Sequence, residues 1–461
     1  MSESVQHPDK SGVEEHPSRE AQSSGTVTRY QSLALLGSSL LAAVSTLLVT
    51  MIAQRALNGS ELTEFLLFWA ALFTVTGIIT GIQPEITRAV GTARTRAVAD
   101  RAASGRTVSA EGSAPQGARV VTVATALGAI ASALVLVSSP LWAGHQIPHS
   151  AAVGVTVMAV GVFLYALQAT MSGVTAGEDR WYLFAAVGGL ESAGRLILML
   201  AAALMIPSLA GLEVATVVPM GLWLILAFVT VSGRRLWVAR ADVPARRLSL
   251  NILWSFLSSA AAAVLMMGFP NVLKASGAAE SEPVVLGTLI LAISITRSPI
   301  MIPLQAFQGV AVSAFLKQRH RPVAAFIKPA AAVVAVGAAG ALAAYLVGPL
   351  LFRLIYPPAA GAESAYEAAA SGITLGALVF ASALLALMTL SGNMALAVNQ
   401  HRIYLAGWVV AAAVTLSLAF LVPAPLVPRA IVALAVGPVC GFVVHMVGVA
   451  LASRTEEAHA E

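Results

Sequence analysis

The stretch Ile293 to Gln308 reads ISITRSPIMIPLQAFQ, and it carries one arginine and two prolines inside an otherwise apolar segment. That segment extends from Pro283 to Leu316, which is about 34 residues, or ~51 Å of ideal helix. A bilayer presents about 30 Å of hydrocarbon, so Arg297 falls near the middle of a membrane-spanning helix. An arginine at that depth costs about 2.5 to 3.5 kcal/mol on insertion scales. We therefore expect Arg297 to face the interior of a helix bundle.

The composition of the whole chain is that of a membrane protein, with 58% hydrophobic and 11% charged residues over 461 positions. Spanning the hydrocarbon takes ~20 apolar residues in a helix, and the sequence offers about twelve such runs. We predict an all-α integral membrane protein with twelve transmembrane helices in two pseudo-symmetric six-helix lobes around a central cavity. The predicted spans are Leu33 to Ala53, Phe65 to Ile82, Val120 to Leu141, Ala151 to Gly173, Trp181 to Ile206, Val214 to Val231, Leu250 to Phe269, Val284 to Leu304, Phe326 to Phe352, Ile373 to Leu390, Tyr404 to Val422 and Ile431 to Ala452.

The distribution of basic residues predicts the orientation and the division of the chain. Most of the 27 lysines and arginines fall on the termini and the even-numbered loops, so we expect both termini to be cytoplasmic. A basic loop then separates two sets of six spans. The predicted parts are residues 1–31, a disordered cytoplasmic tail; 32–232, an N-lobe with spans 1 to 6; 233–249, a basic cytoplasmic linker; 250–452, a C-lobe with spans 7 to 12; and 453–461, a second cytoplasmic tail.

The fifth predicted span contains GGLESAGR, in which Gly188, Glu191, Ser192 and Arg195 share one helix face. Glu191 and Arg195 stand four residues apart and can form an ion pair. Two interpretations stay open at this point. Either the pair neutralises itself while it holds helices together, or Arg195 binds an anionic substrate that Glu191 holds or releases.

The eighth predicted span carries a second polar stripe around Arg297. Its members are Ser294, Arg297, Ser298, Met301, Gln305 and Gln308. No acidic residue lies within two turns of Arg297, so its guanidinium needs water, backbone carbonyls or a bound anion. Pro299 and Pro303 each remove a backbone donor and are candidate gating hinges. The alternative is a plain helix kink in which Arg297 donates to the carbonyls of a neighbour.

Two further stripes complete the predicted cavity lining. They are Ser39, Thr46, Thr50 and Gln54 in the first span, and Asn251, Ser255 and Ser258 in the seventh. Hydroxyl and amide groups are also common in ordinary helix contacts, so each stripe alone is weak evidence. The acidic residues before the second and eighth spans, among them Glu64, are interpreted as solvated charge.

Enzymatic motifs are absent from the sequence: it has no Walker motif, no metal-ligand cluster and no nucleophile with a base. We therefore predict a protein that is not an enzyme, without catalytic residues, metal or cofactor beyond a coupling H⁺ or Na⁺. The basic loops serve as topology signals and contacts with membrane lipids, and they imply no nucleic-acid partner.

The twelve spans, the basic middle loop and the segment GPLLFRLIYPP, Gly348 to Pro358, resemble a known family. This is the multidrug, oligosaccharidyl-lipid and polysaccharide exporter (MOP) superfamily, in its polysaccharide-flippase (Wzx-like) branch. Leu351, Phe352 and Tyr356 match a pattern of the ninth span in that family, whereas Arg353 replaces its glycine.

The resemblance implies a flippase of the bacterial cytoplasmic membrane that moves polyprenyl-phosphate-linked sugars or oligosaccharides to the outer leaflet by alternating access, for cell-envelope polysaccharide biosynthesis. It implies a monomer that works beside polysaccharide-assembly enzymes, with Arg195, Arg297 and Glu191 as headgroup candidates. A net positive set of deep charges suits an anionic substrate. The alternatives are a cation-coupled multidrug antiporter of the same superfamily, which would use Glu191, and a non-transporting scaffold of a glycan synthesis complex.

Overall fold

The computed structural model describes residues 29–104, 117–277, 283–317, 322–358, 363–398 and 400–460. These residues form helices and no β-strand, and twelve helical segments are long and apolar enough to cross a membrane. The prediction of a twelve-span, all-α membrane protein is thereby confirmed. In chain order the elements are α1 (Arg29–Ala56), α2 (Gly59–Ile79), α3 (Ile82–Ser104), α4 (Val120–Gln146), α5 (Ala151–Gly177), α6 (Trp181–Met205), α7 (Leu209–Val217), η2 (Val218–Gly221), α8 (Trp223–Val229), η3 (Gly233–Val238), α9 (Ala245–Ala263), η4 (Val264–Gly268), α10 (Phe269–Ala275), α11 (Pro283–Lys317), α12 (Pro322–Ile355), α13 (Glu363–Ala370), α14 (Gly372–Ala397), α15 (His401–Leu421) and α16 (Leu426–Ala460).

Three spans differ in extent or regularity from the sequence prediction. The second continues from α2 through a turn at Thr80 and Gly81 into α3, so the helical segment is much longer than a membrane is thick. The sixth begins earlier, because Ser208 caps α7 by accepting a hydrogen bond from the Gly211 amide at 3.2 Å. The seventh is broken into α9, the π-helical turn η4 and α10.

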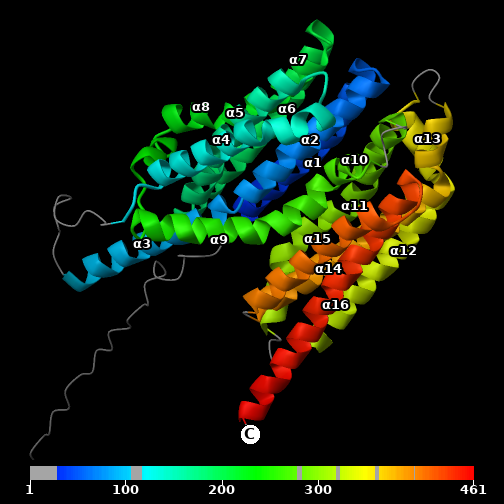
Figure 1. Ribbon diagram of the computed structural model, residues 1–461. Coiled ribbons are helices and arrows are strands. Elements are labelled where there is room, and N and C mark those ends of the chain that lie inside the picture. The colour runs from blue at the N-terminus through cyan, green and yellow to red at the C-terminus, as the bar shows by residue number, and fades with distance from the viewer. Residues whose placement is uncertain are drawn as a thin grey trace, which may run out of the picture.

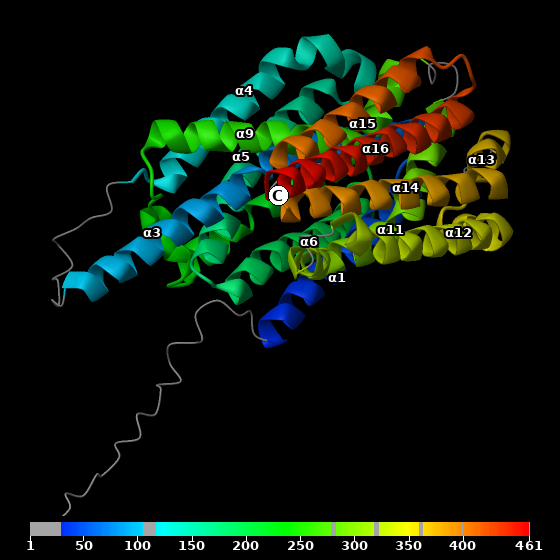
Figure 2. The ribbon, with the colours of Figure 1, turned by 90° about the horizontal axis from the view of Figure 1, so that it is seen from below.

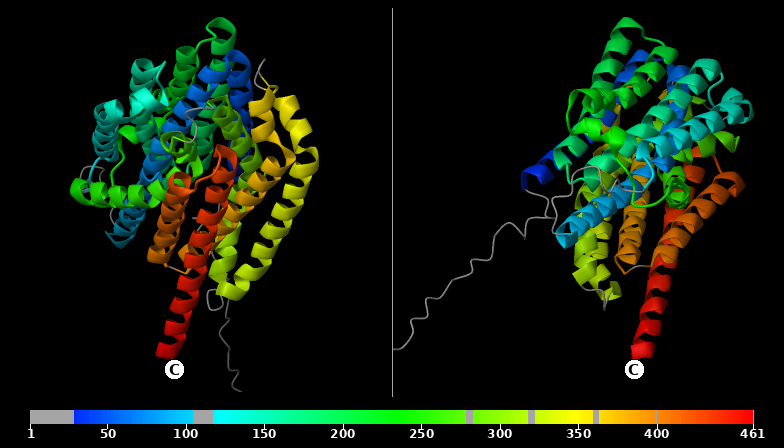
Figure 3. Two further views of the ribbon diagram at one scale, coloured as in Figure 1. Left: turned by 45° about the vertical axis from the view of Figure 1, so that its right-hand side comes forward. Right: turned by 90° about the vertical axis from the view of Figure 1, so that its left-hand side faces the viewer.

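The helices gather into two bundles, which we call the N-lobe (α1 to α8) and the C-lobe (α9 to α16). In the N-lobe, α1 packs along α6, and α5 packs against both α3 and α4. In the C-lobe, α14 lies among α11, α12 and α16, and α15 pairs with α16. Figures 1 and 2 show the two bundles, with α9 running beside the N-lobe toward the C-lobe. The end of α16 projects beyond the other helices (Figure 3).

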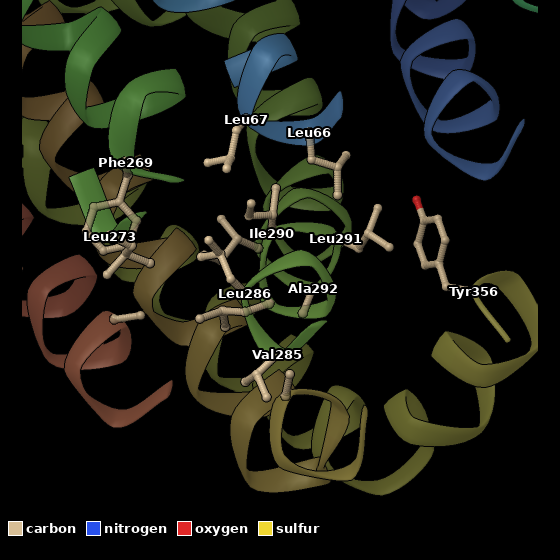
Figure 4. Close-up of a cluster of buried hydrophobic side chains, with 14 of the residues drawn as sticks. Leu66, Leu67, Phe269, Leu273, Val285, Leu286, Ile290, Leu291, Ala292 and Tyr356 are labelled. Atoms are coloured by element: carbon tan, nitrogen blue, oxygen red, sulfur yellow. The ribbon is translucent and has the colours of Figure 1, made fainter. Parts of the chain in front are cut away.

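The lobes share one core at a single end of the molecule. We call this the far end; there α1 meets α2 and α12 is followed by α13. Buried apolar side chains from both lobes form one cluster, which includes Leu66 and Leu67 of α2 together with Phe269, Leu286 and Ile290 of the C-lobe (Figure 4). At the opposite, terminal end, where α1 begins, the N-lobe cluster takes in Leu248 and Ile252 of α9, whereas α11, α12, α14 and α16 form a cluster of their own. Close packing thus holds the lobes together mainly at the far end.

The segment that joins the lobes is bound to the N-lobe by backbone pairing. The Ala241 amide donates to the Ala118 carbonyl at 2.9 Å, and the Ala118 amide donates to the Val243 carbonyl at 3.0 Å. Arg88 of α3 pairs with Glu85 at 2.6 Å and with Asp242 of the joining segment at 3.2 Å. The first of these two ion pairs joins residues three positions apart on α3, a spacing that brings side chains together on a helix. The joining segment therefore moves with the N-lobe.

Glycine permits the closest backbone contact between α9 and the N-lobe, and this contact generates a prediction. A Cβ on Gly81 would lie 2.8 Å from the backbone carbonyl carbon of Ser255, whereas a Cβ on Gly188 of α6 would have no atom of the described chain within 4 Å. We expect Gly81→Ala to destabilise the protein by about 1 to 3 kcal/mol through overpacking. Thermal unfolding of the purified protein measures this.

Gly188→Ala is the matched control, since in an open helical position alanine is favoured over glycine by about 1 kcal/mol at most. An equal loss of stability in both variants would contradict the close contact.

Candidate functional site

Glu191 and Arg195 of α6 form the ion pair that the sequence predicts. Arg195 is only 6% exposed and donates through Nη2 to the Glu191 carboxylate. The second carboxylate oxygen of Glu191 accepts a hydrogen bond from Gln168 of α5 at 2.5 Å. The Arg195 Nε lies 3.5 Å from the Thr216 carbonyl of α7. Both charges are therefore satisfied by groups of the N-lobe.

Two aromatic rings of α2 cover the Arg195 guanidinium. Its central carbon lies 5.8 Å from the centroid of the Trp69 ring and 5.1 Å from that of Phe73. Both distances suit a cation–π contact, which gains strength away from water. Arg195 thus connects α6 to α2, and the pair as a whole is electrically neutral.

Arg297 of α11 has a different environment inside the C-lobe. It donates through Nη1 to the carbonyl of Met266 in η4. Its Nε is buried and has no hydrogen-bond partner among the described residues. A narrow cavity lies beside it and is lined by Thr296, Leu378 and Ser382, among others. The volume that the centre of a water molecule can occupy there is about 10 Å³, so the cavity has room for about one water.

A proline explains why the Met266 carbonyl is available to Arg297. In an α-helix this carbonyl would accept from the amide four residues later, but that residue is Pro270, which has no N–H. The same place contains the π-helical turn η4, and such turns interrupt the regular α-helical pattern. Arg297 donates to a carbonyl whose regular α-helical donor is missing, and backbone groups of a broken helix inside a membrane need such partners.

The other predicted residues of α11 bond within their own helix or lie outside the described side chains. The Ser294 hydroxyl donates to the Ile290 carbonyl, and the Ser298 hydroxyl donates to the Ser294 carbonyl, both at 2.9 Å. Pro299 is exposed, and α11 continues as helix past it. The side chains of Pro303, Gln305 and Gln308, like that of Ser258 in α9, lie outside the described residues.

The predicted stripe on α1 divides into two parts. Ser39 and Thr46 are both exposed. Thr50 and Gln54 instead contact the chain just after α12: the Tyr356 hydroxyl lies 2.7 Å from the Thr50 hydroxyl, and Gln54 Nε2 donates to the Pro357 carbonyl at 2.5 Å. Thr50 already donates to Leu47, so Tyr356 is the donor of their shared bond. Burial raises the pKa of Tyr356, which keeps this phenol protonated.

In α9, the amide of Asn251 donates to the Glu85 carboxylate of α3 at 2.8 Å. Ser255 lies against Gly81, at the contact described above. Both residues therefore lie at the junction between α9 and the N-lobe.

The structure does not bring Arg195 and Arg297 into one cluster, because α2 and η4 lie between them. Arg195 contacts the face of α2 that carries Trp69 and Phe73. Thr74 of the same helix lies so close to Gly268 of η4 that a Cβ there would be 3.1 Å from the Thr74 hydroxyl. The two cations are thus connected through this contact between the lobes.

A buried acidic cluster near the far end of the N-lobe was missed in the sequence. Glu64 of α2 is 4% exposed and accepts from the amides of His149 and Ser150, each at 2.8 Å, and its other oxygen lies 2.7 Å from His149 Nδ1. Glu213 of α7 is fully buried and accepts from the Ser150 hydroxyl at 2.6 Å. The interpretation of Glu64 as solvated charge is wrong, because this side chain caps the turn before α5.

Comparison with known proteins shows which family the chain belongs to. No protein-family model matches the chain. The uncharacterized protein Rv1510 of Mycobacterium tuberculosis is 31% identical over 402 residues, covering 87% of each chain. The uncharacterized protein Rv3630 of the same organism is 32% identical over 411 residues, covering 89% of each chain. The chain belongs to the family of these mycobacterial proteins.

Comparison with solved structures shows that this chain has the fold seen in MOP superfamily transporters. An inward-facing multidrug resistance MATE family transporter of that superfamily aligns with a TM-score of 0.67 at 14% identity, over 92% of this chain and 99% of the other. The lipid II flippase MurJ in an inward closed conformation aligns with a TM-score of 0.65 at 9% identity, over 92% and 87%. The fold expected from the sequence resemblance is therefore confirmed.

The shared Met266 carbonyl generates a second prediction. Arg297→Ala removes the side-chain donor to this carbonyl, so we expect it to destabilise the protein by about 1 to 3 kcal/mol. Pro270→Ala returns a backbone N–H at the position of the missing donor. The loss of Arg297 should then cost less in the Pro270→Ala background, with a coupling of about 0.5 to 3 kcal/mol. Thermal unfolding of the four proteins in this double-mutant cycle measures it.

Additive effects of the two substitutions would show that Arg297 does not replace the donor that Pro270 removes.

Proposed function

We propose that this chain is a transporter, and not an enzyme, that moves a polyprenyl-phosphate-linked sugar or oligosaccharide from the cytoplasmic to the outer leaflet of the bacterial cytoplasmic membrane. It works by alternating access in cell-envelope polysaccharide biosynthesis, as a monomer beside polysaccharide-assembly enzymes and with H⁺ or Na⁺ as coupling ion. The fold of MOP superfamily transporters supports this proposal. That fold by itself leaves the substrate open.

The observation that carries the substrate class is the uncompensated charge of Arg297. Among the described residues no carboxylate forms an ion pair with it, and its Nε is free to donate. A phosphate oxygen is a stronger acceptor for a guanidinium than a backbone carbonyl, because the bond is charge-assisted on both sides. The headgroup phosphate replaces the Met266 carbonyl when movement of the surrounding helices widens the cavity. Arg195 contributes only if Glu191 releases it.

The distribution of apolar contacts supports alternating access. The lobes share a core at the far end, whereas at the terminal end α9 is the C-lobe helix that joins the N-lobe cluster, and α11, α12, α14 and α16 form a separate one. With cytoplasmic termini, as the basic residues predict, this arrangement corresponds to a transporter that is closed toward the outside. Headgroup binding at Arg297 loosens η4 from α11 and so favours rearrangement of the contact between η4 and α2.

A flipping assay tests the proposal. The full-length protein is reconstituted with a fluorescently labelled, polyprenyl-diphosphate-linked sugar, and a membrane-impermeant quencher reports how much lipid changes leaflet. We expect Arg297→Gln to lower the rate about ten- to a hundredfold, since a charge-assisted hydrogen bond is worth about 1.5 to 3 kcal/mol. Arg297→Lys keeps the charge but loses the forked geometry, so it should retain part of the rate.

Thr389→Ala is the matched control, because the Thr389 hydroxyl donates to the Leu385 carbonyl of its own helix at 2.8 Å. Full flipping by Arg297→Gln would refute the role of this arginine, and no flipping by the wild-type protein would refute the substrate class.

The buried carboxylates favour a second candidate, a cation-coupled multidrug antiporter. Glu213 has one oxygen without a partner among the described residues, and Glu191 lies in the N-lobe interior. In that function a pH or Na⁺ gradient across proteoliposomes drives extrusion of a cationic dye. Glu191→Gln and Glu213→Gln would then abolish extrusion. Wild-type protein that flips the lipid-linked sugar without extruding the dye excludes this candidate.

A further inference from the structure

A second cationic site lies at the terminal end of the N-lobe, away from Arg297. A pocket of about 660 Å³ opens between α3, the turn joining α5 to α6, and the segment that begins with η3. One face of α3 lines it with residues at helical spacing, Val90, Ala93, Arg94, Ala97 and Val98. Arg180, Arg235 and Arg240 complete a set of four guanidinium groups around the pocket.

The four arginines are only partly neutralised. Arg180 pairs with Glu178, and Arg94 pairs with Asp179, each at 2.8 Å. Arg240 donates to the Gly117 carbonyl at 3.1 Å. Arg235 is exposed, and within the described parts of the chain no carboxylate forms an ion pair with it. Four cations face two carboxylates, so the pocket keeps an excess positive charge.

Neighbouring residues place this pocket at the depth of a membrane interface. Trp181 begins α6 and Trp237 lies in η3, and tryptophan is typical of the boundary between hydrocarbon and water. The aliphatic residues at its rim are exposed: Val98 is 58% and Val238 is 68% exposed. The pocket therefore combines guanidinium donors with an apolar edge, and basic pockets between helices bind the headgroups of anionic lipids.

We propose that this pocket binds an anionic phospholipid of the cytoplasmic leaflet, with the phosphate among Arg94, Arg180 and Arg235 and an acyl chain beside Val98 and Val238. The site is separate from Arg297 and from the translocated substrate. Since η3 opens the segment that joins the lobes, a lipid bound across α3 and η3 fixes that segment to the N-lobe. Occupancy of the pocket thus stabilises the N-lobe as one unit.

Arg235 offers the sharpest test, because it lines the pocket without a carboxylate partner, whereas the adjacent Arg234 is also exposed but does not line it. The full-length protein in phosphatidylcholine nanodiscs is titrated with phosphatidylglycerol, and the shift in thermal unfolding is recorded. We expect Arg235→Gln to weaken the apparent affinity about tenfold, because the phosphate loses a charge-assisted hydrogen bond from the guanidinium in the pocket. Arg234→Gln should leave the affinity unchanged.

A parallel titration with inorganic phosphate separates the two sources of the anion. Stabilisation by phosphatidylglycerol alone supports the lipid site, and equal stabilisation by inorganic phosphate would assign the pocket to a soluble anion instead. Equal weakening in both variants, or none in Arg235→Gln, would overturn the proposal by showing that general surface charge accounts for the binding. Both variants change exposed side chains, and unfolding in phosphatidylcholine alone checks that they remain folded.

Discussion

The Met266 carbonyl accepts a hydrogen bond from Arg297 because Pro270 removes the donor that the helix would have supplied. Inside a bilayer an unsatisfied backbone group costs several kcal/mol, and so does an isolated guanidinium. The hydrogen bond between the Arg297 guanidinium and the Met266 carbonyl reduces both of these costs. The seventh span can therefore break into α9, η4 and α10 within the bundle, and Arg297 of α11 contacts the break.

Helix α2 connects this interaction to the N-lobe. One of its faces covers Arg195 with Trp69 and Phe73, and Thr74 lies against Gly268 of the broken span. The shared apolar core at the far end adds contacts between the same helix and the C-lobe. A change in the partner of Arg297 thus acts at the place where the lobes meet. This arrangement suits a protein that exchanges one set of contacts between its lobes for another during transport.

The sequence was sufficient for the features that depend on local spacing and hydropathy. Twelve apolar runs predicted the spans, and a separation of four residues predicted the pair of Glu191 and Arg195. The isolation of Arg297 left water, backbone carbonyls or a bound anion as its partner, and the structure shows the carbonyl of Met266. The hydrogen bond between Gln54 and Pro357 joins residues that are about 300 positions apart in the sequence. It depends on tertiary packing, for which no local sequence signal exists. Glu213 was missed because its span was predicted to begin at Val214, which placed Glu213 in a loop, whereas α7 begins at Leu209.

Distances between the lobes test the central claim, that headgroup binding at Arg297 rearranges the contact between them. Spin labels are placed in a Cys440→Ala background at Ser60 and Ser364 for the far end, and at Thr95 and Arg402 for the terminal end. On addition of the polyprenyl-diphosphate-linked sugar, we predict a longer distance at the far end and a shorter one at the terminal end, with neither change in Arg297→Gln. Unchanged distances in the wild-type background, or the same changes without the arginine, would contradict the account.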